Sequence, residues 1–131
     1  MSLDQYAPRM LSVLRIMTGL LFLAHGSAKL LGFPAPAAPA AITMFSLPWI
    51  SGVIELVGGL AIALGFFTRA AAFITAGEMA AAYFIAHASR DFFPVRNGGD
   101  AAVLFCFIFL FLVAAGAGPW SVDAMRTKTA A

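Results

Sequence analysis

Four apolar runs are the feature of this sequence that most restricts its fold. They cover residues 10–31, 49–67, 70–87 and 101–118, and each is near the ~20 residues that a helix needs to cross a bilayer. The chain has 131 residues, of which 62% are hydrophobic and 11% charged, and a domain of this size could not bury so much apolar surface in water. We therefore expect an all-α fold, a four-transmembrane-helix bundle that forms one membrane domain over residues 1–131.

The distribution of basic residues predicts the orientation of this bundle. With four spans, both termini lie on the same side as the short link that the sequence predicts at Thr68 and Arg69. That side carries more basic residues than the other, namely Arg9, Arg15, Arg69, Arg126 and Lys128 against Lys29, Arg90 and Arg96. Because cytoplasmic loops carry the excess of lysine and arginine, we expect both termini in the cytoplasm.

Several classes of protein fit this sequence poorly. A single cysteine, Cys106, excludes an intrachain disulfide and a thiol redox pair. The net charge of +2 is scattered, without a basic run, so nucleic acid is not an expected partner. Neither Glu55 nor Glu78 is followed by histidine three residues later, so the di-iron motif is absent and no metal site is expected. His25 and His87 leave haem ligation open as an alternative.

One face of the first span is polar. The residues on this face are spaced by three or four positions and are Arg15, Thr18, Phe22, His25 and Lys29. At about 100° per residue they fall within a sector of roughly 80°. Since ionisable groups are costly in hydrocarbon, this face is predicted to point into the bundle.

The ionisable residues of the spans are predicted to meet. His25 and Glu55 both lie about 9 Å below the outer surface by the helical rise, and Lys29 is one turn higher, within reach of Glu55. Glu78 lies nearer the midplane, and Arg15 lies near the cytoplasmic end, where it either snorkels or reaches toward Glu78. The charges of the two basic and two acidic residues cancel, so we expect a paired internal network with Lys29–Glu55 as its clearest contact. Such a network either fixes helix register or forms an outward-opening pocket that binds a ligand or passes protons.

Three motifs resemble those of the DoxX family of small bacterial membrane proteins. They are HGxxKL at residues 25–30, ELxGGxxxxxGxxTR at residues 55–69, and NGG followed by GPWSxD between residues 97 and 123. The order of these motifs makes the resemblance specific, and it covers nearly the whole chain. Asp100 stands where we expect a glutamate of the family, and this exchange keeps the charge.

The resemblance implies a four-helix bundle in the bacterial inner membrane. Some DoxX relatives are subunits of quinone-linked redox systems, and others belong to thiol and oxidative-stress complexes. We therefore expect a redox-associated subunit that has no covalently bound cofactor and takes electrons from a protein partner. Its expected ligand is a quinone, held by a polar pocket of His25, Lys29, Glu55 and Glu78. The sequence does not decide whether the chain is itself an enzyme.

Two other functions remain open from the sequence. The chain could be a scaffold or assembly subunit, in which the charged network stabilises the bundle and glycine-rich faces contact partner proteins. It could also be a small-solute or proton transporter. Because four helices enclose little aqueous path, transport would need a homo-oligomer.

Overall fold

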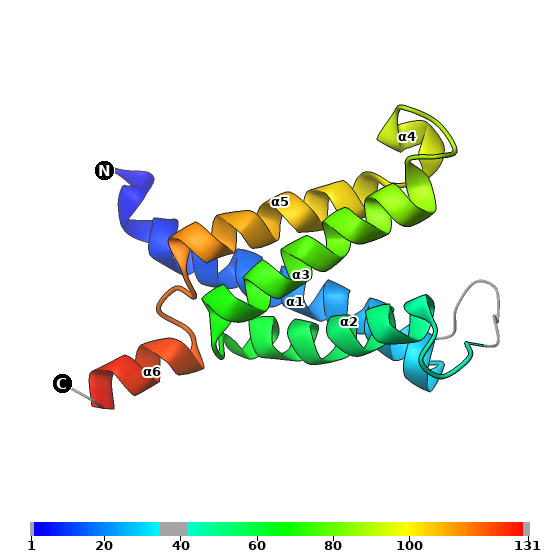
Figure 1. The fold of residues 1–131 in the computed structure, drawn as a ribbon. Coiled ribbons are helices and arrows are strands. Elements are labelled where there is room, and N and C mark those ends of the chain that lie inside the picture. The colour runs from blue at the N-terminus through cyan, green and yellow to red at the C-terminus, as the bar shows by residue number, and fades with distance from the viewer. Residues whose placement is uncertain (1, 35–41, 130–131) are drawn as a thin grey trace.

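The computed structural model describes residues 2–34 and 42–129, and all regular structure in these ranges is helical, which confirms the all-α class. The longer helices are α1 (Ala7–Leu31), α2 (Leu47–Leu64), α3 (Thr68–Ala82), α5 (Asp100–Ala115) and α6 (Val122–Thr129). A 3-10 turn (Leu3–Tyr6) leads into α1, a π-helical turn (Tyr83–His87) extends α3, and α4 (Pro94–Asn97) is a single turn. Figure 1 shows the four longest helices as one elongated body.

Three helices in the described part of the chain are long and apolar enough to cross a membrane. They are Leu3–Leu31, Leu47–Leu64 and Thr68–His87. α5 is also apolar but has only 16 residues. It ends at Ala115, three residues before the predicted end of the fourth apolar run, because Gly116 has a positive φ of 85° that does not continue a helix.

The link between the second and third helices differs from the prediction. α2 ends at Leu64, because Gly65 adopts the left-handed conformation with a φ of 70°. Residues 65–67 then form the connection. Thr68 and Arg69, which the sequence predicted as the link, are the first residues of α3.

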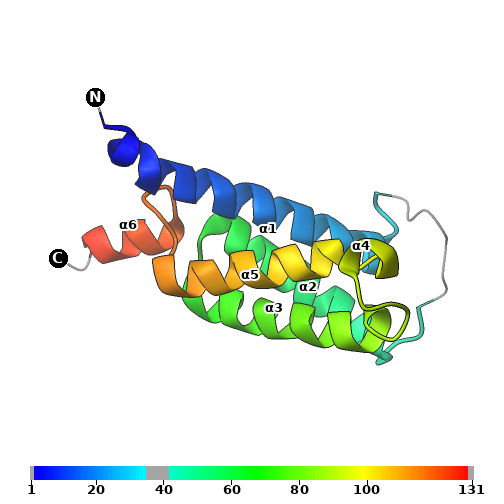
Figure 2. The same cartoon turned by 90° about the horizontal axis from the view of Figure 1, so that it is seen from above.

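The four longest helices pack as two close pairs, α1 with α2 and α3 with α5 (Figures 1 and 2). Three glycines set the spacing of the first pair. A methyl group at Gly19 or Gly26 of α1, or at Gly59 of α2, would overlap main-chain atoms of the facing helix. These positions therefore allow the two backbones to approach more closely than any other residue would permit.

The two pairs diverge along the length of the molecule. Near the middle they are held together by aromatic packing, where the rings of Phe22 from α1 and Phe109 from α5 lie 4.8 Å apart between centroids. Figure 1 shows the pairs separating toward the end that carries α4, while Figure 2 shows the described ends of the chain near the opposite end. A cavity lies between the separated pairs at the α4 end.

Candidate functional site

A cavity of about 640 Å³ lies between the two helix pairs at the α4 end. Its walls are mainly apolar and include Phe22 of α1, Met79 of α3 and Phe105 of α5. Polar side chains line it from three helices, namely His25, Lys29, Ser51, Glu55, Glu78 and His87. All four predicted site residues therefore face one cavity.

The predicted ion pair is present. Lys29 Nζ lies 2.8 Å from Glu55 Oε1, and the Glu55 side chain is only 4% exposed, whereas that of Lys29 is 33% exposed. Lys29 is in the last turn of α1, so its ammonium also faces the negative end of the helix dipole. This arrangement confirms the sequence prediction that the two residues meet.

Ser51 joins the ion pair to the second carboxyl. Its Oγ accepts a hydrogen bond from Lys29 Nζ at 2.9 Å and donates one to Glu78 Oε1 at 2.8 Å. It also lies 3.4 Å from Glu55 Oε1. Ser51 was not among the predicted site residues, although it lies four residues before Glu55 and so shares its helix face. We name Lys29, Ser51, Glu55 and Glu78 the polar cluster.

His25 lines the cavity beside the polar cluster. Its ring meets Phe105 edge-on, with centroids 5.8 Å apart, and it has no hydrogen bond to the polar cluster in the described structure. His87, at the cavity rim, is fixed instead to the loop, since its Nδ1 lies 3.0 Å from the main-chain oxygen of Asn97. His25 therefore stands apart from the hydrogen bonds of the polar cluster, at the wall of the same cavity.

Arg15 does not join the polar cluster, so the prediction of a four-residue network was wrong. Its side chain is fully buried, with 0% exposure. The guanidinium donates to four main-chain carbonyls, those of Ile62, Ala63, Ala117 and Trp120. Ile62 and Ala63 lie in the last turn of α2, where the helix dipole places partial negative charge, so their carbonyls satisfy a buried cation without a carboxylate. The polar cluster therefore contains one cation and two carboxyls.

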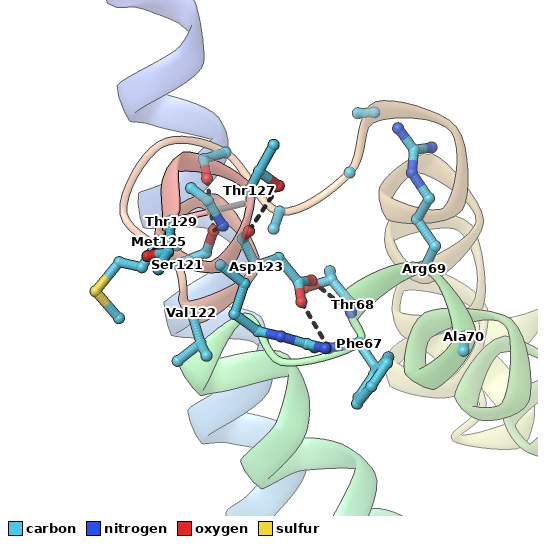
Figure 3. Close-up of a pocket in the computed structure, with 16 residues that line it drawn as sticks. Phe67, Thr68, Arg69, Ala70, Ser121, Val122, Asp123, Met125, Thr127 and Thr129 are labelled. Atoms are coloured by element: carbon cyan, nitrogen blue, oxygen red, sulfur yellow. Dashed lines mark hydrogen bonds between the residues drawn. The ribbon is translucent and has the colours of Figure 1, made fainter. Parts of the chain in front are cut away.

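A larger hollow of about 1230 Å³ lies at the other end of the molecule, between α6 and the start of α3 (Figure 3). Two of its charged groups, Asp123 and Arg69, cap helix ends. The Asp123 carboxylate accepts hydrogen bonds from the main-chain N–H groups of Phe67 and Thr68, both at 2.9 Å. Arg69 donates to the carbonyls of Val113 and Ala114 at the end of α5. Because these groups are already engaged, we assign the candidate site to the smaller cavity.

The hydrogen bonds to Asp123 shift its titration. Burial by itself raises the pKa of this carboxyl, but the bonds from Thr68 and Phe67 and the nearby Arg126 guanidinium outweigh it, so the pKa is lowered from its ordinary value. Arg126 also lies over the ring of Phe67, with 4.6 Å between its Cζ and the ring centroid. The GPWSxD motif thus has a structural explanation, because its aspartate caps α3 and its tryptophan carbonyl binds Arg15.

Comparison with known proteins identifies the family of this fold. The DoxX family model matches residues 10–88, more than half of the chain. The chain belongs to the DoxX family. An uncharacterized protein of Haemophilus influenzae is 41% identical over 126 residues, which cover 93% of this chain and 94% of that protein. Inner membrane protein YqjF of Escherichia coli (strain K12) is 30% identical over 128 residues, covering 88% and 91%. No solved structure matches the chain.

Membership of the DoxX family bears on both location and site. Together with several apolar helices and the similarity to an inner membrane protein, it makes this chain a multi-pass protein of the inner membrane. The matched residues 10–88 include the whole polar cluster and His25. The cavity wall formed by α5 lies outside the match.

Proposed function

We propose that this DoxX-family protein is a redox-associated membrane subunit that binds a quinone-class molecule in the cavity between its helix pairs. The observation that carries the proposal is the juxtaposition of an apolar cavity with a hydrogen-bonding cluster at one wall. Electrons would come from a protein partner, and the chain would supply binding and orientation.

The cavity suits such a molecule in size and chemistry. A volume of about 640 Å³ falls within the range of roughly 300–1,000 Å³ typical of small-molecule sites. Phe22, Met79 and Phe105 offer surfaces against which a ring can pack. The Lys29 ammonium and the His25 ring lie at the same wall and suit the ring oxygens of the ligand.

The membrane arrangement belongs to the same proposal. We propose that α5 is a fourth span and that both termini are cytoplasmic. α5 is about 24 Å long by its rise, somewhat less than a bilayer core of about 30 Å, and it runs alongside α3. The two described ends of the chain lie at the same end of the molecule in Figure 2. The start of α1, the start of α3 and α6 carry Arg9, Arg69 and Arg126, which provide the basic excess.

Thiol labelling tests this arrangement. Cys106 is first replaced by alanine, and a single cysteine is then introduced by Arg96→Cys or by Ala124→Cys. A membrane-impermeant thiol reagent applied to intact cells should label the first variant, and label the second only after the membrane is permeabilised. Equal labelling of both variants in intact cells would contradict four spans.

Bound quinone can be measured directly. The protein is purified with its native lipids, and quinone is extracted and quantified against protein. We expect near-stoichiometric quinone in the wild type and in Asp4→Asn, a change at an exposed carboxyl outside the cavity. Glu55→Gln should lower it several-fold. Absence of quinone from the wild type, with no binding of added quinone or hydroquinone, would end this proposal.

A scaffold role is the second candidate, and one observation favours it. The Lys29–Glu55 pair crosses between α1 and α2, so it stabilises the contact between these helices whatever the cavity holds. This role predicts that Lys29→Ala or Glu55→Ala lowers protein abundance, because each leaves a charge without its partner. The double variant should partly restore abundance, whereas the ligand-binding role predicts loss of binding in all three.

A further inference from the structure

Two oxygens of the polar cluster lack a hydrogen-bond partner. Glu55 Oε2 and Glu78 Oε2 are both buried, and neither is bonded to any group in the described part of the chain. Both residues line the cavity. Buried polar atoms in native proteins nearly always have a partner, and leaving one unsatisfied is costly. An occupant that reaches these two oxygens would therefore have to supply hydrogen-bond donors.

The other groups of the polar cluster are already engaged. Lys29 Nζ uses two of its three N–H donors, on Glu55 Oε1 and on Ser51. The Ser51 hydroxyl uses its single donor on Glu78 Oε1. Within the polar cluster, one unused N–H therefore stands against two unpartnered carboxyl oxygens, so the cluster has more acceptors than donors.

We infer that the cavity selects an occupant with hydroxyl donors, and thus the hydroquinone form of a quinone-class ligand over its oxidised form. This inference rests on the proposed function and names the form of the ligand that the site recognises. A hydroquinone hydroxyl donates to a carboxylate oxygen, and such charge-assisted bonds are stronger than those between neutral groups. A quinone carries only acceptor oxygens, so it can accept from Lys29 or His25 but leaves Glu55 Oε2 and Glu78 Oε2 unsatisfied.

The net charge of the polar cluster also favours a ligand that donates hydrogen bonds. The polar cluster has one ammonium for two carboxyls, and the basic residue that could have balanced it, Arg15, is bound to carbonyls elsewhere. A retained proton on Glu55 or Glu78 would turn one unpartnered oxygen into a donor, and the quinone would then bind as well as the hydroquinone. Binding measurements on matched ligands distinguish these cases.

The test uses three ligands with the same decyl-substituted ring: the benzoquinone, its hydroquinone kept reduced without oxygen, and the dimethyl ether of the hydroquinone. Each is titrated into the full chain in lipid nanodiscs. Because the chain has a single cysteine and no disulfide, the reductant leaves its covalent structure unchanged. We expect the hydroquinone to bind at least about tenfold more tightly than either of the others.

Each result decides the inference. Equal affinity for quinone and hydroquinone, or for the hydroquinone and its dimethyl ether, would overturn it while leaving the proposed function in place. Binding of decylammonium with none of the hydroquinone would also overturn it, because the acceptors would then serve a cation. If no ring ligand binds, the proposed function fails as well.

A variant assigns the selectivity to the polar cluster. Glu78→Gln keeps the shape of the side chain but removes its carboxylate, so the hydroquinone preference should fall to about twofold or less. Asp4→Asn removes an exposed carboxylate outside the cavity and should leave the preference unchanged. A full preference in Glu78→Gln would contradict the role of this residue. The comparison of ligands on the wild type does not depend on this variant folding.

Discussion

Ser51 Oγ lies 2.8 Å from Glu78 Oε1, although the two residues belong to neighbouring helices. Through this bond the carboxyl of α3 is connected to the Lys29–Glu55 pair of α1 and α2. One small hydroxyl thus links three helices at the cavity wall. Its removal is the mildest change that tests whether the polar cluster acts as a unit.

We expect Ser51→Ala to lower the free energy of unfolding by about 1–3 kcal/mol, because it leaves Glu78 Oε1 without its donor and Lys29 with one acceptor fewer. Unfolding in detergent, followed by circular dichroism, measures the change. Ser27→Ala is the matched control, since that hydroxyl bonds only to Ala24 of its own helix. Equal effects of the two substitutions would show that Ser51 is an ordinary helix serine.

Arg15→Met should destabilise the protein by about 3 kcal/mol or more, because it leaves four carbonyls without their shared donor. Arg15→Lys should recover only part of this loss, since an ammonium lacks the planar fork that reaches several carbonyls at once. Thermal unfolding in detergent reports the order of the variants. Arg9→Met, at an exposed arginine, serves as the control and should change stability by less than about 0.5 kcal/mol. An Arg15→Lys variant as stable as the wild type would show that the planar guanidinium is not needed at this position.

Gly59→Ala should weaken the α1–α2 contact by about 1–3 kcal/mol, because the added methyl group would overlap the main chain at Leu23. The control is Gly77→Ala in α3, where an added methyl group meets no atom within 4 Å. That change should be neutral or stabilising by up to about 1 kcal/mol, because alanine favours helix more than glycine does. Melting temperatures of the two variants give the comparison, and similar shifts would exclude close helix approach at Gly59.

Asp123 should make the stability of the protein depend on pH in the acid range. The pKa of Asp123 is lowered in the folded protein, so its full contribution to stability is present above its ordinary pKa of about 3.8. As the pH falls below that value the unfolded chain takes up the proton first, and stability is lost until the pH passes the lowered folded pKa. Melting temperatures between pH 7 and pH 3 should fall more steeply for the wild type than for Asp123→Asn. Parallel curves for the two proteins would show that Asp123 adds nothing to the acid dependence.

The parts of the site that depend on helix periodicity could be predicted from the sequence. Lys29 and Glu55 were paired correctly because their depth in the bilayer follows from a fixed rise per residue. Arg15 was misplaced because a buried cation is satisfied as well by helix-end carbonyls as by a carboxylate, and residue types do not reveal where a helix ends. Ser51 was missed because it carries no charge, and only its neighbours across the bundle make it part of the polar cluster.

The all-α class was predictable from the apolar runs, but the ends of the helices were not. α2 and α5 stop where Gly65 and Gly116 take positive φ values, and this depends on backbone conformation more than on hydropathy. The role of Asp123 could not be predicted from the sequence either, because it caps a helix that begins 55 residues earlier in the chain.

The divergence of the two helix pairs has a mechanical consequence. Arg15 and Asp123 tie α1, α2, α3 and the segment after α5 to one another at one end, while glycine packing makes α1 and α2 a stiff unit. Relative rotation of the pairs is then restrained at this end by Arg15 and Asp123, and at the cavity end by the bond between Ser51 and Glu78. A substitution at Arg15 that loosens the first of these connections should therefore change the spacing of the two pairs, and with it the width of the cavity.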